Sequence, residues 1–236
     1  MAAECEHGAA SHDGTEPSMA SAPEASRAWL LVEHPGPWPH EPTETVLPAP
    51  LDALVPSAAR LGIRVQMIRR PGSRGVSGGV LAGWTAGREP WLRHGTAAAV
   101  HRALDLEDLA AGRPVAFGSP VREPVFLVCA HAQRNACCAR YGGPLAQALA
   151  ARYPGQVFQT THVGGHRFAA NLVILPHGLY YGPVGLAEAT AAIGAYERGA
   201  VTPGRYRGRA GQPRPAQEAE HEVLVRTGSL RVAALA

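Results

Sequence analysis

Short apolar runs alternate with amphipathic segments along the chain, and this alternation predicts a mixed α/β fold. In the first half we expect strands over 28–33, 63–68, 80–84 and 91–94, and helices over 51–61 and 105–111. The first of these strands, over 28–33, is an apolar run. Gly62 and Gly112 follow the two helical segments and mark where each helix ends.

The second half repeats the same order of elements. Here the pattern predicts strands over 125–128, 157–160, 172–175 and 179–181, and helices over 139–152 and 186–196. Each half therefore runs strand, helix, strand, strand, strand, helix, the order expected of a thioredoxin-like sheet covered by helices. We predict a thioredoxin-like C-terminal domain preceded by a smaller α/β domain. A similar topology and an ancient duplication are one interpretation, although the halves share no obvious residue identity.

Composition suggests where the folded part begins and ends. Residues 1–27 are rich in Ala, Ser, Glu, His and Gly, which predicts a disordered tail. We then expect an N-terminal α/β domain over 28–119 and the thioredoxin-like domain over 120–200. Residues 201–236 are rich in Pro, Gly and Arg before becoming weakly helical, and we expect this extension to pack on the domain.

The charge pattern narrows the class of partner. The net charge is +3, and all of the basic residues are Arg, scattered along the chain rather than clustered. This distribution does not indicate a nucleic-acid surface. Residues 1–27 have no basic start and no apolar run, so we do not expect a signal peptide there. The chain also has no run of roughly 18 apolar residues, the length that a membrane span needs. We therefore expect a cytoplasmic protein that does not enter a membrane.

The cysteines give the first indication of chemistry. Cys5 lies in the predicted tail, whereas Cys129, Cys137 and Cys138 lie within ten residues of one another. A secreted disulfide framework spreads and pairs its cysteines. A cluster of this kind in a cytosolic chain points instead to metal or redox chemistry.

Two histidines are expected at the same edge of the sheet as two of these cysteines. Cys129 ends one predicted strand and Cys138 lies where the next helix starts, while His162 follows the strand that ends at Thr161. Open α/β sheets place ligands at the carboxyl ends of strands, and helix N-termini favour thiolates. Two glycines allow a sharp turn that brings His166 back beside His162.

The spacing of these ligands does not by itself identify a metal. The His-x₃-His pair fits structural zinc, but an eight-residue separation of the cysteines is wider than zinc sites usually show. A Rieske centre needs two C-x-H pairs, and Cys129-Ala-His131 supplies only one. A two-iron cluster is larger than one zinc ion and suits widely spaced ligands. From the residues alone, the kind of metal stays open.

Several longer motifs make the chain resemble the sucrase/ferredoxin-like family of thioredoxin-like [2Fe–2S] proteins. They are Cys129-x₈-Cys138, Cys137-Cys138-Ala139, His162-x-Gly-Gly-His166-Arg-Phe-Ala-Ala-Asn171 and Leu175-Pro-x-Gly-Leu-Tyr-Tyr-Gly182, with Trp29–Glu33, Pro35–Trp38, Ile68–Gly72, Arg207–Arg209 and Gln217–Glu220. The resemblance covers nearly everything after the tail. The chain departs from the family pattern at Ala130, Ala132 and Asn135, where the family usually has Thr, Gly and Asp.

The resemblance implies a specific ligand set and function. Cys129 and Cys138 would bind one iron, and His162 and His166 the other, in a protein that exchanges single electrons with a protein redox partner. Four further residues are expected near the cluster: Arg134, Cys137, Arg167 and Asn171. We interpret Cys137 as a bystander, because adjacent side chains rarely reach one metal, and His131 as a residue that caps or hydrogen-bonds locally.

Other functions remain to be weighed. One is a metal-free thiol–disulfide protein that uses Cys129 with Cys137 or Cys138, and another is a zinc-stabilised interaction module. Sugar hydrolysis needs two opposed carboxylates, and none stand out near the motifs. The run Gly75-Val-Ser77-Gly-Gly79 matches a hydrolase nucleophile elbow but lacks the strand before it and the helix after it. No nicotinamide or flavin motif is present, so electrons are expected from another protein.

Overall fold

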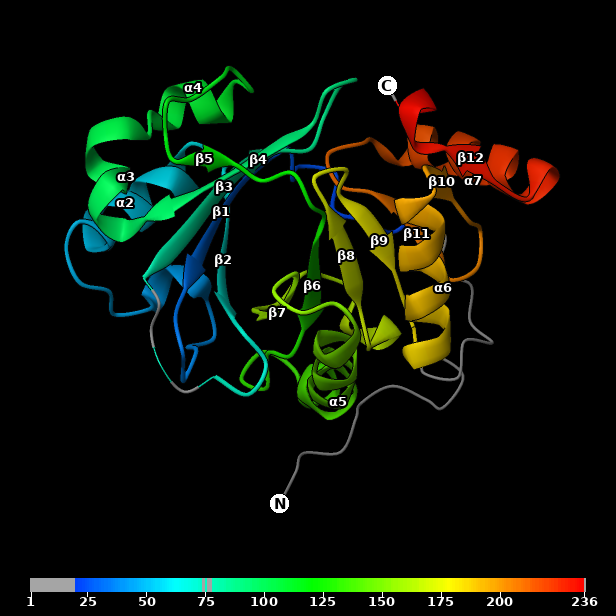
Figure 1. Cartoon of the computed structure of the whole chain (residues 1–236), viewed down its shortest axis with the longest axis horizontal. Coiled ribbons are helices and arrows are strands. Elements are labelled where there is room, and N and C mark those ends of the chain that lie inside the picture. Colours follow the sequence, from blue (N-terminus) through cyan, green and yellow to red (C-terminus); the bar gives the residue numbers. More distant parts are fainter. Residues whose placement is uncertain (1–19, 74, 76–77, 236) are drawn as a thin grey trace.

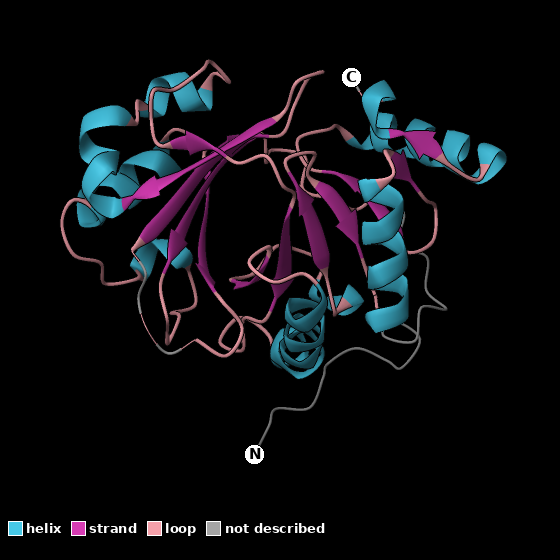
Figure 2. Ribbon diagram, in the orientation of Figure 1, coloured by secondary structure: helices cyan, strands magenta, loops and turns pink. Residues whose placement is uncertain are grey.

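The computed structural model of the chain describes residues 20–73, 75 and 78–235, as a curled sheet covered by helices (Figures 1 and 2). The strands are β1 (Ala28–Glu33), β2 (Arg64–Arg69), β3 (Gly79–Trp84), β4 (Trp91–Thr96), β5 (Ser119–Pro120), β6 (Val125–Cys129), β7 (Val157–Thr160), β8 (Leu172–Leu175), β9 (Leu179–Tyr181), β10 (Ala200–Val201), β11 (Tyr206–Arg209) and β12 (Leu230–Arg231). The helices are α2 (Leu51–Arg60), α3 (Ala97–Ala103), α4 (Leu106–Ala110), α5 (Ala136–Arg152), α6 (Leu186–Glu197) and α7 (Arg214–Thr227), with 3₁₀ turns η1 (Pro42–Glu44), η2 (His166–Phe168) and η3 (Val232–Ala234).

The main sheet confirms the predicted α/β class and has a symmetrical strand order. Its order is β11-β9-β8-β6-β7-β2-β1-β3-β4-β5, so the five strands of the first half mirror those of the second. In each half the first two strands are parallel and the third runs antiparallel to the first. The two halves therefore repeat one topology, as the alternation of elements in the sequence suggested.

The halves join edge to edge in the middle of the sheet. Strands β2 and β7 pair antiparallel over Ile68↔Thr160 and Arg69↔Gln159. One continuous sheet thus runs through both halves (Figure 2). The separate folding of 28–119 and 120–200 as domains stays a prediction.

Alternate residues of the central strands β1 and β6 pack into different hydrophobic cores on the two faces of the sheet. In β1, Leu30 and Val32 pack under α2, α3 and α4, whereas Trp29 and Leu31 face the opposite side of the sheet. In β6, Phe126 and Val128 pack against α5 and α6, while Leu127 and Cys129 face that same opposite side. This shared inner core draws residues from both halves and contains Cys129 and Cys138. Burial on both faces explains why these strands are continuously apolar.

Two helices differ from the sequence expectation. Helix α5 begins at Ala136 rather than at residue 139, because the side chain of Asn135 accepts a hydrogen bond of 2.9 Å from the N–H of Cys137 and caps the helix. Helix α3 was not predicted. It is capped by Thr96, and Val100 is its one fully buried residue, so it shows almost no apolar periodicity.

The segment before β1 packs on the C-terminal half. The N–H groups of Ser21 and Ala22 donate to the carbonyl of Arg207 at 2.8 and 3.1 Å. The amide of Gln217 donates to the carbonyl of Ala22 at 3.0 Å and accepts from its N–H at 3.1 Å. The first 19 residues of the predicted tail, with Cys5, lie outside the described residues.

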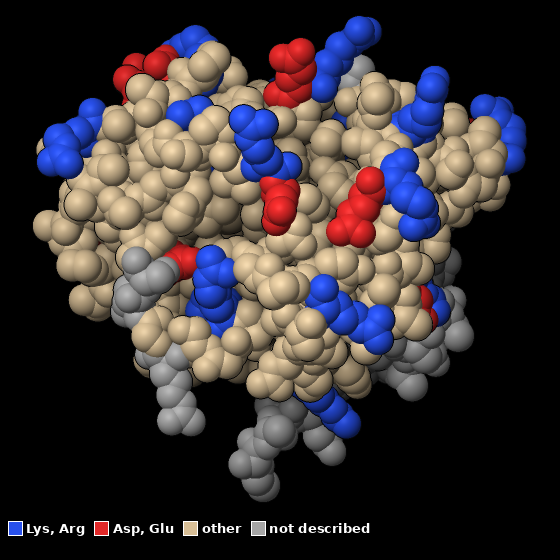
Figure 3. Space-filling model, in the orientation of Figure 1, with Lys and Arg blue, Asp and Glu red and all other residues tan. Residues whose placement is uncertain are grey.

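The visible surface carries a mixture of charges. Arginine and acidic side chains are interspersed on the face shown in Figure 3. This agrees with the scattered arginines of the sequence and shows no basic patch on that face. None of the helices in the described part of the chain is both long and apolar enough to cross a membrane.

Candidate metal centre

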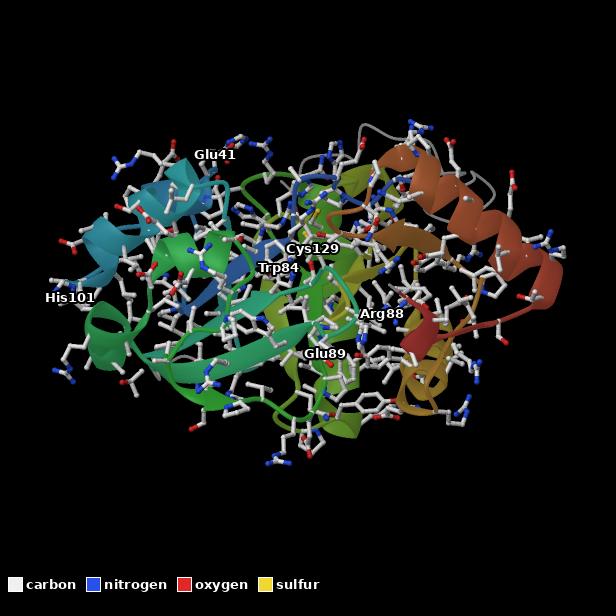
Figure 4. All side chains as sticks on the ribbon, turned by 90° about the horizontal axis from the view of Figure 1, so that it is seen from above. Glu41, Trp84, Arg88, Glu89, His101 and Cys129 are labelled. Atoms are coloured by element: carbon white, nitrogen blue, oxygen red, sulfur yellow. The ribbon has the colours of Figure 1, made fainter. Side chains whose placement is uncertain are left out.

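Three of the expected ligands meet at the inner core. Cys129 is the last residue of β6, Cys138 lies in the first turn of α5, and His162 follows β7 by two residues. The Nδ1 atom of His162 is 4.0 Å from Sγ of Cys129 and 3.7 Å from Sγ of Cys138. The potential ligand atoms of all three residues lie within 4.8 Å of one another. Figure 4 shows Cys129 near the middle of the molecule.

A glycine allows the two cysteines to approach each other. A Cβ atom built on Gly142 would lie 1.8 Å from the carbonyl oxygen of Cys129, so helix α5 touches the end of β6 at this point. Only glycine permits so close a contact between two backbones. The first turn of α5, with Cys138, is thereby held against the strand end that carries Cys129.

The two cysteines are buried and share a hydrogen bond rather than a disulfide. Cys129 is 1 % exposed and Cys138 is fully buried, and both are free thiols. The hydrogen bond from Cys138, aided by the nearby His162, holds the pKa of Cys129 well below its ordinary value despite burial. The same hydrogen bond, burial and the charge on Cys129 raise the pKa of Cys138. A positive centre bound between the two sulfurs would allow both to ionise.

His131 supports the site and is not among its ligands. Its Nδ1 accepts a hydrogen bond of 3.1 Å from the backbone N–H of His162. An unprotonated Nδ1 means that Nε2 carries the proton, and Nε2 donates to the carbonyl of Pro39 at 2.7 Å. Burial lowers the pKa of His131, which keeps the ring neutral. Both ring nitrogens are therefore occupied by hydrogen bonds, but the partners lie 31 and 92 residues away in the chain, whereas the sequence interpretation placed these bonds locally.

The two histidines of the His-x₃-His motif lie beside each other, as expected. Gly164 and Gly165 adopt φ values of +97° and +70°, which glycine reaches without strain. The turn places the ring centroid of His166 5.6 Å from that of His162. Both side chains are half-buried, and the four candidate ligands thus come from β6, α5, the loop after β7 and the start of η2.

The four residues expected near the cluster have different environments. The guanidinium of Arg134 contacts His40 and Glu41 at the surface. Arg167 is exposed, with its guanidinium 4.6 Å from the ring centroid of Phe168. Cys137 is buried next to Cys138. Asn171 is buried and donates to the carbonyl of Gly165 at 3.0 Å, so it holds the histidine loop directly.

Two further residues of the site were missed by sequence reasoning. The amide of Gln66 donates to the carbonyl of His162 at 3.2 Å and accepts from the hydroxyls of Thr160 and Thr161 at 3.1 and 2.6 Å. The guanidinium of Arg207 donates to the carbonyl of Gly164 at 3.3 Å. Gln66 is a buried polar residue inside β2, and its contact with the carbonyl of His162 joins residues 96 apart in the chain, so no local pattern in the sequence marks it.

The nucleophile-elbow pattern does not have the context that a hydrolase needs. Strand β3 begins at Gly79, so a strand and not a helix follows the pattern. Ser77 itself lies outside the described residues.

Comparison with known proteins adds one finding. Residues 93–208 match the sequence model of the sucrase/ferredoxin-like family. This range includes all four candidate ligands and the loop that joins the two histidines. No curated protein and no solved structure matches the chain.

Proposed function

From the match of residues 93–208 to the sucrase/ferredoxin-like family, we propose that this protein binds a [2Fe–2S] cluster and exchanges single electrons with a protein partner. The observation that carries the proposal is the convergence of Cys129, Cys138 and His162, with His166 beside them. In this proposal the two cysteines hold one iron and the two histidines hold the other.

The donor set fits such a cluster. Thiolate and imidazole are the protein ligands that iron–sulfur centres use, including the mixed set of Rieske sites. The cysteines are free and buried, so both sulfurs are available to a metal and shielded from solvent. No carboxylate is a member of the metal-binding group found among the described residues, which disfavours a hard cation such as Mg²⁺.

The arrangement suggests which side of the centre faces a partner. When bound, the cluster supplies a one-electron couple. Cys129 and Cys138 are enclosed by the inner core, whereas His162 and His166 are half-buried. The imidazoles are therefore the part of the ligand set nearest to solvent, and a redox partner would approach this side.

A zinc site is the second candidate, because of the distances around His162. Zinc binds sulfur at about 2.3 Å and nitrogen at about 2.0–2.1 Å in a tetrahedron. Such a site places sulfur and nitrogen roughly 3.5 Å apart, which follows from those bond lengths. The Sγ–Nδ1 separations of 3.7 and 4.0 Å are close to this value. Thiol–disulfide exchange is the weakest candidate, since both thiols are buried and reactive cysteines need access.

Metal content and electron paramagnetic resonance distinguish these functions. We expect the full chain, supplied with iron and sulfide under anaerobic conditions, to bind two irons and two sulfides and to turn brown. Reduction with dithionite should then produce the signal of a mixed-valence two-iron cluster. A colourless protein that takes up one zinc ion and no iron would instead establish the zinc site.

A further inference from the structure

Arg207 is a buried cation beneath the histidine loop. Arg207 is 1 % exposed. Its guanidinium donates hydrogen bonds to the carbonyl of Gly164 at 3.3 Å and to Oδ1 of Asn171 at 2.5 Å. A Cβ atom built on Gly165 would lie 2.1 Å from Nη2 of Arg207. The loop between His162 and His166 therefore rests on the guanidinium.

The charge of Arg207 has no carboxylate partner among the described residues. Its Nε and Nη2 atoms donate to Oγ and to the carbonyl of Ser21 at 3.0 and 2.8 Å, and both acceptors are neutral. The guanidinium carbon lies 5.0 and 5.6 Å from the ring centroids of Phe168 and Tyr180. None of the ion pairs found within 20–73, 75 and 78–235 includes Arg207.

Another buried arginine of strand β11, Arg209, is paired with a carboxylate. Arg209 is also buried, and its Nε lies 2.8 Å from a carboxylate oxygen of Glu220. Burying a cation without such a partner is costly, and buried charges are normally paired. The charge of Arg207 is therefore not neutralised by a described carboxylate and can interact with another negative group close to it.

We propose that Arg207 is a positioning residue whose charge raises the reduction potential of the cluster. This inference rests on the proposed function. With two ferric ions, two sulfides and two thiolates the oxidised cluster is neutral, and the added electron makes it negative. A fixed positive charge in a low-dielectric interior stabilises the negative state more than the neutral one. Burial lowers the pKa of Arg207 to about 10, so it remains charged at neutral pH.

Two pairs of variants separate charge from shape. Arg207→Lys keeps the charge but not the planar fork, whereas Arg207→Met removes the charge. Ser21→Asp places a carboxylate beside the guanidinium without removing any bond from Arg207 to the histidine loop, and Ser21→Asn is its neutral match. The double variant Arg209→Met/Glu220→Gln removes a guanidinium that is already neutralised and serves as the control.

The measurement is the reduction potential of the reconstituted full-length protein, by redox titration followed by electron paramagnetic resonance. We expect Arg207→Met to disfavour reduction about tenfold, a fall of about 59 mV for one electron. The reduction potential of Ser21→Asp should be lower than that of Ser21→Asn. The potentials of Arg207→Lys and of the Arg209/Glu220 control should stay near the wild-type value.

The outcomes distinguish the inference from the proposed function. Assembled clusters with unchanged potentials in Arg207→Met and Ser21→Asp would overturn the inference alone. Should Arg207→Met fail to fold, the comparison of Ser21→Asp with Ser21→Asn decides. A wild-type protein that binds no iron–sulfur cluster overturns the inference together with the proposed function.

Discussion

The Nδ1 atom of His131 accepts a hydrogen bond of 3.1 Å from the backbone N–H of His162. The same ring donates from Nε2 to the carbonyl of Pro39 in the first half of the chain. His131 therefore ties the loop that carries one candidate ligand to a segment 92 residues away. A neutral histidine with both ring nitrogens in hydrogen bonds orients the candidate site and leaves no ring nitrogen free for a metal.

Removing this imidazole should loosen the metal site. We expect His131→Ala to lower the free energy of unfolding by about 1–3 kcal/mol, because the N–H of His162 loses its acceptor in a partly buried position. Iron retention should fall with it. His131→Asn, whose Oδ1 can replace Nδ1 as the acceptor, should recover part of both. Urea unfolding and iron analysis test this, and equal losses in the two variants would contradict it.

Replacing either histidine of the motif should abolish the cluster. We expect His162→Ala and His166→Ala to lose nearly all iron and the visible absorption, because cluster binding needs every ligand in place. His177→Gln changes a histidine in the β8–β9 turn and is the matched control, with wild-type iron content expected. The assignment fails if both alanine variants keep their iron and spectrum.

The vicinal cysteines should differ in their importance. Sγ of Cys138 lies 3.7 Å from Nδ1 of His162, and Cys138, unlike Cys137, belongs to the metal-binding group among the described residues. Iron per chain should therefore collapse in Cys138→Ser and persist in Cys137→Ser. The reverse result would mean that Cys137, and not Cys138, supplies the ligand.

The contact between Gly142 and Cys129 should be sensitive to one methyl group. We expect Gly142→Ala to destabilise the protein by about 1–3 kcal/mol or more, because helix α5 must move away from the end of β6. Iron retention should fall as Cys138 moves. Gly194→Ala in α6 is the control: its Cβ would meet only the tip of the Arg198 side chain at 3.3 Å. It should stabilise by up to about 1 kcal/mol. Thermal unfolding of both variants is the test.

Protonation of His177 should oppose folding at acid pH. Burial, with a smaller effect of Arg209, lowers the pKa of His177 to about 4, and its Nδ1 lies 2.6 Å from the hydroxyl of Tyr196. Below its ordinary pKa of about 6.5 the unfolded chain binds more protons than the folded one, so stability falls as the pH drops toward 4.

Replacing His177 should therefore flatten the pH dependence of stability. Between neutral pH and pH 5, wild type should lose about 1 kcal/mol more than His177→Gln, a figure reduced for partial exposure to solvent. Urea unfolding at several pH values measures the difference. Parallel pH profiles for the two proteins would show that His177 does not titrate across this range.

Local pattern was sufficient for most of the elements. The apolar runs of β1 and β6, the spacing in α2 and the acidic start of α4 each reflect contacts within a few residues of the chain. Asp105, for example, accepts hydrogen bonds from the N–H groups of Glu107 and Asp108, both at 2.9 Å. Such signals lie inside a short window, and they predicted the α/β class and the repeated order of elements.

The candidate ligands could also be named from the sequence, because Cys129, Cys138, His162 and His166 stand in motifs of fixed spacing. The residues that surround these ligands could not be predicted from the sequence. Gln66 and Arg207 reach the histidine loop from strands far along the chain, and no local periodicity records such contacts.

The sequence by itself thus determined which segments are strands and helices and which residues could bind a metal, since both depend on neighbours in the chain. Only the tertiary structure decided that β2 and β7 join the halves into one sheet and that a cation with no carboxylate partner among the described residues lies beneath the histidine loop. Those features depend on which distant surfaces pack together, and packing of apolar surface is non-directional, so it leaves no positional signature in the residues concerned.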